Sequence, residues 1–378
     1  MMVEFTVEKQ ALEAALKVVG KAVSGRPTMP VLKMVLMDAV EGVLRLRATD
    51  LDLDVTAKVE ARVRKPGKVC LPVKKMAAVV AKLGDDSLEF KKASESEIEM
   101  VAGSARFTLK TIDPDEFPPF ANVESDSEIS ENQGELRDRI RAVAYAQSRD
   151  EGRYVLCGVK LETAGSCIRL VATDGRRLAV SGRNFPIEVN ADRGIVLMTK
   201  MIDVIEGLCD EEESLSMCWD DRRTVVKLTV GEKLENAGLL GSVVIGGRLI
   251  EARYPDWKEA HPGALDHVVE VARKAFQEIL EREALMCDPD HQKVCLSFAE
   301  NRLTVSAGGA YFGKVEDFLP IEWEGGELRI AFNPAFLIDV LAGSEAETVK
   351  LRLQGELSPM VIRTDECSEC VVMPLRLA

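Results

Sequence analysis

The sequence predicts an α+β protein made of three similar domains. Its 378 residues are enough for two or three domains of about 100–200 residues each. One strand-and-corner string occurs three times, at residues 44–50 (LRLRATD), 168–174 (IRLVATD) and 303–309 (LTVSAGG), so successive copies begin 124 and 135 residues apart. Because this spacing is far above the roughly 20–50 residues of solenoid repeats, the repeating unit is a whole domain.

A second set of landmarks keeps nearly the same spacing. Strand-to-helix units around Lys75, Lys200 and Ala335 are offset by 125 and 135 residues. Prolines concentrate in two joints, at 113–119 and 254–263, where they interrupt strand pairing. The predicted domains are 1–118, 130–254 and 263–378.

Each domain is expected to run in the order helix, strands, shorter helix, strands. Apolar residues at three-four spacing predict early helices at 7–23, 135–149 and 268–283, and shorter helices at 73–83, 199–208 and 334–341. Alternating runs such as 105–110 (ARFTLK) predict the strands. Two helices beside many strands indicate an α+β arrangement in which the helices cover one face of a sheet.

The composition is that of an ordinary globular protein, with 46% hydrophobic and 30% charged residues. No apolar run reaches the roughly 18–20 residues of a membrane helix, and the first residues do not resemble a signal peptide. We therefore expect a cytoplasmic protein that does not contact a membrane. The net charge of −14 argues against a general nucleic-acid binder, provided that the charge is evenly spread.

The charge is in fact segregated along the chain. Segments 7–26, 72–83 and 135–149, which include three of the predicted helices, carry +2, +3 and +2. The other helical segments, 198–208, 268–283 and 332–342, carry −1 each, which leaves −18 on the remaining residues. Basic helices on an acidic body can contact phosphates without reading a base sequence.

No motif for catalysis, metal binding or cofactor binding is found, so we expect no catalytic residue, no metal and no cofactor. The three histidines, at 261, 267 and 291, show no HExxH or triad spacing, and the P-loop, GxSxG and GxGxxG patterns are absent. Cys367 and Cys370 form the only close cysteine pair and lack further zinc ligands. An enzymatic alternative would use the Asp residues of the first two repeated strings, but the third copy has none.

Seven strings, in order along the full length of the chain, resemble one known family. They are SGRPTMPVL (24–32), ATDLDL (48–53), RYVLCG (153–158), VATDGRRLAV (171–180), RYPDW (253–257), FNPAFLIDVL (332–341) and VVMPLRL (371–377). On a threefold repeat of this length, they resemble the bacterial sliding clamps, the β subunits of DNA polymerase III.

The resemblance implies a DNA clamp fold and a head-to-tail homodimer. Two chains would form a closed ring of six domains, with helices inside and sheets outside, around double-stranded DNA. Such a ring is a non-catalytic processivity factor of DNA replication that tethers the replicative polymerase. Weak, sequence-independent phosphate contacts would permit sliding, and an acidic exterior fits the charge pattern.

The resemblance also implies a hydrophobic pocket between the second and third domains. In the family this pocket binds short linear motifs of the replicative polymerase catalytic subunit, the clamp loader, other polymerases and repair proteins. The matching positions here are Leu156, Thr173, Gly175, Arg176, Arg177, Leu178, Pro255, Val371 and Met373, flanked by Asn333 and Phe336. Aliphatic and Met side chains accept the Leu or Phe anchors of varied peptides.

The chain departs from the family pattern at two positions near the pocket and in one longer segment. Ala260 stands where a larger aliphatic residue is usual, and Pro359 stands where a small polar residue is usual. Both changes are expected to reshape part of the pocket. The segment Glu232–Gly247 has no counterpart that the pattern identifies.

For DNA, the resemblance points first to Arg26, Arg149 and Tyr154, and then to Lys74, Lys75, Arg137 and Arg141. Asp150 stands where the family often has an amide. Phe107 and Leu109 are the expected dimer contacts of the first domain. The acidic helices of the third domain leave one alternative open, an interaction scaffold of clamp-like fold that does not encircle DNA.

Overall fold

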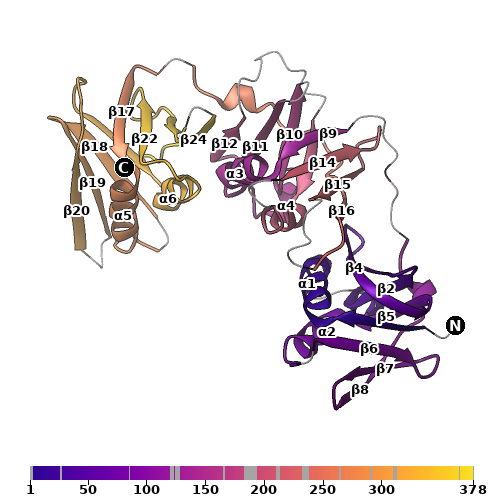
Figure 1. The fold of residues 1–378 in the computed structure, drawn as a ribbon. Helices are drawn as coiled ribbons and strands as arrows, with labels where there is room; N and C mark the ends of the chain where they lie inside the picture. The colour runs from indigo at the N-terminus through magenta and orange to yellow at the C-terminus, as the bar shows by residue number, and fades with distance from the viewer. Residues whose placement is uncertain are drawn as a thin grey trace. The chain divides into compact units, whose positions relative to one another are not determined.

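The structure is a computed structural model (Figure 1). It describes residues 3–25, 28–84, 86–119, 123, 128–164, 167–182, 194–209, 213–231, 238–263, 265–289, 292–309, 313–365 and 367–377. The chain divides into two compact units. Unit 1 comprises Met1–Leu136 and Asp203–Leu249, and unit 2 comprises Arg137–Ile202 and Ile250–Ala378.

Unit 1 is built around a 12-stranded antiparallel sheet, in which nine strands follow the order β8-β7-β6-β1-β4-β16-β15-β14-β9. Strand β3 pairs with β4 and β2, and β2 pairs with β5. The strands are β1 (Glu4–Glu8), β2 (Met34–Val40), β3 (Val43–Thr49), β4 (Leu53–Lys65), β5 (Gly67–Pro72), β6 (Ser87–Lys92), β7 (Glu97–Ala102), β8 (Ala105–Lys110), β9 (Ile129–Asn132), β14 (Ser214–Trp219), β15 (Val225–Val230) and β16 (Val243–Arg248).

Strand β16 accounts for part of the segment 232–247, which the sequence pattern left unassigned. Residues 232–237 lie outside the described residues, but β16 pairs with β15 on one side and with β4 on the other. Val243 and Ile245 alternate along β16 and are both buried. The strand therefore joins the first predicted domain to strands of the second in one sheet.

Helices α1 (Lys9–Val19) and α2 (Val73–Val80) pack against each other, and α1 also packs on β4. Helix α1 buries Leu12, Leu16 and Val19, which lie on one face because they are four and three residues apart. The predicted helix start at residue 7 is wrong, because Glu4–Glu8 form β1 and pair with β4 and β6.

Unit 2 contains two antiparallel sheets. An eight-stranded sheet has the order β13-β10-β11-β12-β24-β23-β22-β17, and a four-stranded sheet has the order β20-β19-β18-β21. The strands are β10 (Gly158–Ala164), β11 (Cys167–Thr173), β12 (Arg177–Ser181), β13 (Ile195–Met198), β17 (His267–Ala272), β18 (Val294–Ala299), β19 (Arg302–Gly309), β20 (Gly313–Pro320), β21 (Leu328–Phe332), β22 (Thr348–Leu353), β23 (Met360–Arg363) and β24 (Ser368–Val372).

The join between β12 and β24 is the feature that builds the site. Leu178 lies opposite Val371 in this pair, and Arg177 lies opposite Val372. Strands of the second predicted domain and of the third therefore form one continuous sheet, although about 190 residues of sequence separate them.

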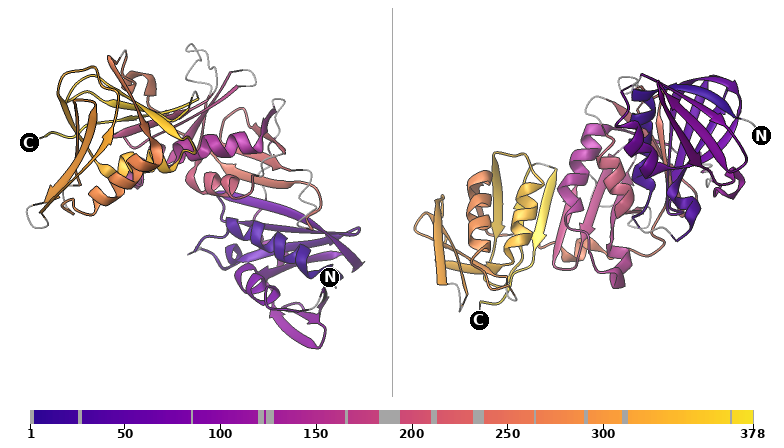
Figure 2. Two further views of the ribbon diagram at one scale, coloured as in Figure 1. Left: turned by 60° about the vertical axis from the view of Figure 1, so that its left-hand side comes forward. Right: turned by 90° about the horizontal axis from the view of Figure 1, so that it is seen from below.

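Helices α5 (Arg273–Ala284) and α6 (Pro334–Ala342) of unit 2 lie side by side, and α5 also packs against β19 and β20 (Figure 2). The predicted helix over 268–283 begins too early, because His267–Ala272 form β17. Val269 and Val271 are buried while Val268 is 54% exposed, which is the alternation of a strand.

Two more helices, α3 (Gln133–Ala144) and α4 (Thr199–Glu206), complete the six that the sequence predicts, although several boundaries shift by a few residues. The α+β fold class is confirmed, with sheets predominating over short helices. Among the described residues, no helix is long and apolar enough to cross a membrane.

Candidate functional site

The first two repeated strings end in the same hydrogen-bonded turn. Thr173 Oγ1 donates to the carbonyl of Arg177 at 2.6 Å, and Asp174 Oδ1 accepts from the backbone N–H groups of Arg176 and Arg177 at 2.9 and 3.0 Å. Thr49 Oγ1 and Asp50 Oδ1 make the corresponding bonds around Leu53. Each carboxylate therefore holds its own turn, as Asx side chains commonly do.

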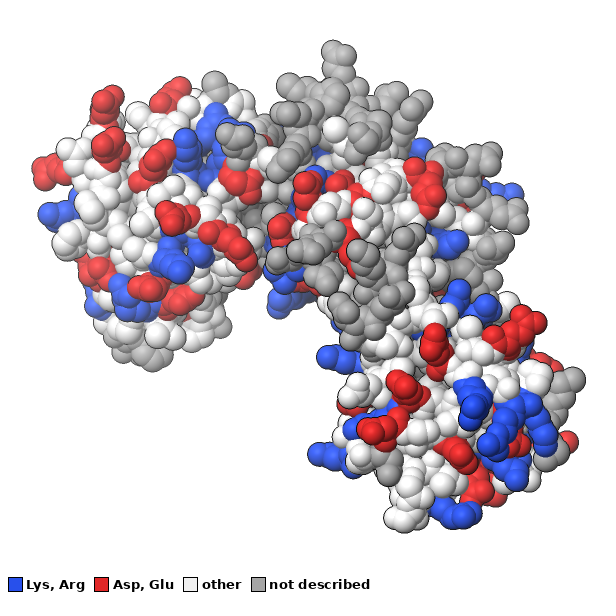
Figure 3. Space-filling model, in the orientation of Figure 1, with Lys and Arg blue, Asp and Glu red and all other residues white. Residues whose placement is uncertain are grey.

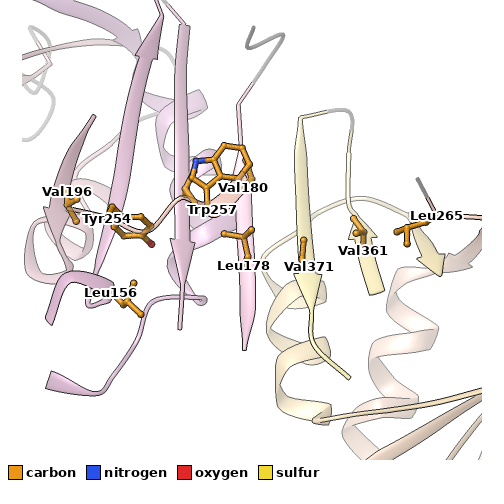
Figure 4. Packing of buried hydrophobic residues seen from close by; sticks show 10 residues of the cluster. Leu156, Leu178, Val180, Val196, Tyr254, Trp257, Leu265, Val361 and Val371 are labelled. Atoms are coloured by element: carbon orange, nitrogen blue, oxygen red, sulfur yellow. The ribbon is translucent and has the colours of Figure 1, made fainter. Parts of the chain in front are cut away.

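An apolar cluster lies across the join of β12 and β24 (Figure 4). It contains three of the predicted pocket residues, Leu156, Leu178 and Val371, all of which are at least 92% buried. Figure 4 shows Leu178 and Val371 on neighbouring strands. The other members are Val171, Val180, Val196, Tyr254, Trp257, Leu265 and Val361.

Sequence reasoning missed Tyr254 and Trp257, although it quoted the string that contains both. It took only Pro255 from RYPDW, and Pro255 is exposed. The two aromatic rings are 94% and 91% buried, and Trp257 Nε1 donates to Glu162 Oε1 at 3.1 Å. The feature that could have identified them is the presence of two large aromatic residues on either side of a proline. Such residues supply much of the apolar area that is buried at a joint.

Exposed side chains border the cluster. Arg176 and Gly175 are exposed at the turn, and Met373 is 46% exposed just after β24. The N–H of Met373 donates to the carbonyl of Arg176 at 3.0 Å, which places these two residues side by side. A buried apolar floor with an adaptable Met at its border is suited to an apolar peptide side chain.

The two positions that depart from the family pattern have different surroundings. Ala260 is exposed at the end of the 3₁₀ helix Trp257–Ala260. Pro359 is half-buried and directly precedes β23, the strand that carries Val361 of the cluster.

Arg177 is the one predicted pocket residue with an extensive polar network. Its side chain is 8% exposed and contacts the turn, the end of α3 and helix α6. Phe336, one of the two predicted flanking residues, lies on α6, and the other, Asn333, is the N-cap residue of this helix. Asn333 Oδ1 caps α6 by accepting from Ala335 N–H at 2.9 Å, and the ring of Phe336 lies 4.6 Å from the Arg177 guanidinium carbon.

The predicted DNA contacts on the helices differ in exposure. Lys74 and Lys75 are exposed on α2, and Arg141 is exposed on α3. Arg137 presents little surface, because its side chain is only 16% exposed and its Nε lies 3.6 Å from Asp138. Arg137 is therefore a weaker candidate than the sequence suggested.

The remaining predicted DNA contacts lie near a short 3₁₀ helix, Glu151–Leu156. Arg149 is exposed, and Tyr154 is 55% exposed with its hydroxyl donating to the carbonyl of Glu251 at 3.4 Å. Asp150, the acid at an expected amide position, caps this helix by accepting from Gly152 N–H at 3.0 Å. Arg26 lies outside the described residues.

Acidic and basic side chains are interspersed on the face drawn in Figure 3, in unit 1 and in unit 2. The charge segregation that the sequence predicts is thus a property of particular helices rather than of this whole face. Some basic side chains of the strands pair with acids, as Arg64 and Lys65 do with Glu4.

Phe107 and Leu109, the expected dimer contacts, lie on β8, which is an edge strand of its sheet. Both side chains are half-buried and alternate with exposed residues. In unit 2 the edge strand β20 has the same alternation, and Phe318 on it is 57% exposed. Leu285, at the end of α5, is 83% exposed.

No group of three or more His, Cys, Asp or Glu side chains is arranged to hold a metal ion within the part of the chain that the structure describes. Cys370 is buried in β24, where burial raises its pKa to about 12. The ring of His267 packs at a tilt of 44° against that of Trp323, with 4.8 Å between ring centroids, and His291 lies outside the described residues.

Three family models match consecutive parts of the chain: the N-terminal domain of the DNA polymerase III β subunit at 3–122, the central domain at 131–256 and the C-terminal domain at 258–376. The chain is 28% identical to the β sliding clamps of Pseudomonas putida KT2440 and Escherichia coli K12, covering 99% of this chain and 100% of each relative.

Solved structures give the same result. The DNA polymerase III β subunit of Pseudomonas aeruginosa superimposes with a TM-score of 0.90 at 27% identity, covering 99% of this chain and 100% of that one. A sliding clamp of Bartonella birtlesii bound to griselimycin has a TM-score of 0.90 at 25% identity, with full coverage of both chains. A griselimycin-bound clamp of P. aeruginosa gives 0.88 at 25%, again with full coverage of both chains.

Proposed function

Because the chain belongs to the family of DNA polymerase III β subunits, the bacterial sliding clamps, we propose that it is a non-catalytic processivity factor that encircles duplex DNA as a closed homodimer. The observation that carries the proposal is the consecutive match of all three β-subunit domains along the chain. Each protomer would contribute three domains, 1–118, 130–254 and 263–378, to a six-domain ring in the cytoplasm.

Two open sheet edges support a head-to-tail dimer. Strand β8 is an edge in unit 1 and β20 is an edge in unit 2, so β8 of one protomer can pair with β20 of its partner. A two-fold axis repeats this contact and closes the assembly after two chains. Pairing would also cover edges that otherwise invite aggregation. Exposed Arg106 and Lys110 on β8 complement exposed Glu316 on β20.

DNA would be held by enclosure rather than by tight contacts. The proposed contacts with phosphates are Arg26, Arg149 and Tyr154 first, and then Lys74, Lys75, Arg141 and Arg137, of which Arg137 has the least exposed side chain. Such contacts position a duplex without reading its sequence and are weakened by salt. A ring held in this way can slide.

The apolar cluster around Leu178 and Val371 is the proposed docking site for partners. Short linear motifs of the replicative polymerase, clamp loader, other polymerases and repair proteins would place Leu or Phe anchors over the floor formed by Leu156, Leu178 and Val371. Met373, Arg176, Gly175, Thr173 and Pro255 would border the bound peptide, and Asn333 and Phe336 would flank it. Two griselimycin-bound relatives indicate that clamps of this family can bind a small ligand, which supplies a convenient probe.

The test is retention on circular and linear DNA. A bacterial clamp loader places the labelled protein on a nicked circular plasmid, and gel filtration measures how much stays bound. We expect retention on the circle, loss after a single restriction cut, and recovered retention when bulky proteins block both ends. Equal retention on circular and unblocked linear DNA would mean ordinary surface binding and would overturn the enclosure mechanism.

A further inference from the structure

We propose that Arg177 is a positioning residue, which sets the shape of the docking site by holding helix α6 against β12, and that a bound peptide contacts its neighbours instead of its guanidinium. This inference rests on the proposed docking function and goes beyond it, because the family resemblance places Arg177 simply among the pocket residues. Under this proposal, Arg177 links two elements of the protein and does not contact the ligand.

The guanidinium of Arg177 is already committed inside the protein. Its Nε donates to Asp174 Oδ2 at 3.1 Å, its Nη1 donates to Asp339 Oδ2 at 2.6 Å, and its Nη2 donates to the carbonyl of Tyr145 at 2.6 Å. All three nitrogens therefore have acceptors, and the residue is only 8% exposed. Three of its five N–H groups are thus used in charge-assisted bonds within the protein, and the low exposure leaves little of the group for a peptide to reach.

These bonds connect elements that are distant in sequence. Asp174 belongs to the turn before β12, Tyr145 directly follows α3, and Asp339 lies on α6. The rings of Phe336 and Tyr145 lie 4.6 and 5.4 Å from the guanidinium carbon. A planar side chain with five donors can hold three partners at fixed angles, which a lysine ammonium cannot do.

The position of α6 matters because α6 and the residue that caps it carry one flank of the site. Asn333 and Phe336 are on this flank, whereas Leu178 and Val371 form the floor on β12 and β24. Arg177 immediately precedes Leu178 in β12 and reaches α6 through Asp339. The Arg177–Asp339 ion pair therefore fixes the distance between floor and flank.

The ion pair is also placed where it can be tested separately from stability. Asp339 has a side chain that is 42% exposed, and when its charge is removed the buried Arg177 guanidinium still has the carboxylate of Asp174 as a partner. Nearby packing supplies independent support for α6, because a Cβ on Gly343 would meet the carbonyl oxygen of Arg141 at 2.9 Å. Helix α6 should therefore stay folded when the ion pair is lost and shift only slightly.

The experiment titrates griselimycin into the full-length protein by calorimetry and compares five variants with the unaltered chain, one of which, Met373→Ala, checks the location of the docking site. Asp339→Asn and Arg177→Lys are expected to weaken binding about tenfold, since either change breaks the link. Asp339→Glu keeps the charge and should recover most of the affinity. Glu345→Gln removes one negative charge from an exposed residue just beyond α6 and should bind like the unaltered chain.

Two further readouts separate positioning from general stability. Melting temperatures should stay the same for Asp339→Asn and Asp339→Glu, while their affinities differ. Raising the salt concentration should weaken binding to the unaltered chain but affect Asp339→Asn less, because the variant has no ion pair to screen.

The outcomes are distinct. If Arg177→Lys weakens binding while Asp339→Asn does not, the guanidinium touches the ligand directly and the positioning role is wrong. Equal affinity in all variants, with normal binding to the unaltered chain, also overturns it. If instead Met373→Ala fails to weaken griselimycin binding, or the unaltered chain does not bind, the docking site itself has been misplaced.

Discussion

His261, in the joint between the second and third predicted domains, lies between two hydrogen-bond acceptors. Its Nδ1 is 2.8 Å from the carbonyl of Pro262, and its Nε2 is 2.8 Å from Oε1 of Glu369 on β24. Because a carbonyl and a carboxylate only accept, both ring nitrogens must donate, and the imidazole is a cation in this arrangement. The ion pair fastens the joint to the strand that carries Val371.

This ion pair should make stability depend on pH. The hydrogen bond with Glu369 raises the pKa of His261 above its usual 6.5, although burial and Arg352 lower it. The same bond, aided by Arg363 and Arg352, lowers the pKa of Glu369 below its usual 4.5. The stabilisation is therefore fully present below pH 6.5 and lost as the pH rises through the folded pKa of His261. At the acid end, it is lost as the pH falls through the folded pKa of Glu369.

We expect His261→Gln to lower the free energy of unfolding by about 1 kcal/mol near pH 6 and by progressively less towards pH 9. Urea unfolding at several pH values measures the difference from the unaltered chain. Glu369→Gln should show the same convergence at high pH, because either change removes the same ion pair. A difference that stays constant from pH 6 to pH 9 would contradict the assignment of a cationic His261.

Individual site residues were predictable where a short string fixed both their type and their position. Leu178 and Val371, which the sequence assigned to one site, lie opposite each other in neighbouring strands, and their role in binding a peptide stays a prediction. The burial of Arg137 and the committed guanidinium of Arg177 were not predictable. Both depend on what packs against the residue in three dimensions, and charge counting along a helix treats every Arg as exposed.

At the scale of elements, the repeated turn is the clearest product of the internal repeat. Leu51 occupies the place that Gly175 holds in the second copy, and the two residues have φ values of +81° and +82°. This left-handed conformation is open to glycine but strains a residue with a Cβ. The first copy therefore retains the turn with a less suitable residue.

Substitutions at these two positions test the backbone strain directly. Leu51→Gly should stabilise the chain by up to about 1 kcal/mol, since relief of strain exceeds the added freedom of the unfolded chain. The reverse type of change, Gly175→Ala, should destabilise it, because the backbone is unfavourable and the new Cβ would meet Arg153 Nη1 at 3.2 Å. Thermal melting of both variants measures this, and a loss of stability in Leu51→Gly would contradict it.

The same comparison indicates why the apolar cluster forms at the second copy and not at the first. Where the second copy has Val171 and Leu178, the first has Arg47 and Asp54, which form an ion pair with an Nη2–Oδ2 distance of 2.7 Å. The Arg47 guanidinium also lies 5.3 Å from the ring centre of Phe117. A charged pair and an aromatic ring thus fill the position that remains apolar in the second copy.

Helices and strands were predicted well where the apolar residues followed a single spacing, either helical or strand-like. They were predicted poorly where a strand-like spacing met a helical one. All six helices exist, but strands β1 and β17 were absorbed into the starts of α1 and α5. In both places a β-strand runs directly into a helix without a Gly or Pro between them, so the apolar residues of the strand extend the helical pattern. Strand β16 was missed because its pairing with β4 involves residues almost 190 positions apart.

For the whole molecule, the proposed ring reconciles a net charge of −14 with DNA as a partner. Affinity for polyanions normally requires a basic surface, but a duplex held by enclosure needs only a few local cations that contact its phosphates weakly. Exposed Lys and Arg side chains on α2 and α3 meet that requirement. Enclosure therefore depends on dimerisation more than on charge.

Dimerisation is accordingly the decisive property of the whole molecule. We expect light scattering at micromolar concentration to give twice the mass of the 41.5-kDa chain. Leu109→Glu on β8 and Leu285→Glu at the end of α5, the helix that packs on β20, should each shift the mass to one chain, because a charge at an apolar interface is costly to bury. Val40→Glu, the same kind of change at a 44% exposed residue of β2, should leave the dimer intact. If Leu109→Glu and Leu285→Glu each form homodimers as readily as Val40→Glu does, the contact lies elsewhere and β8 cannot pair with β20.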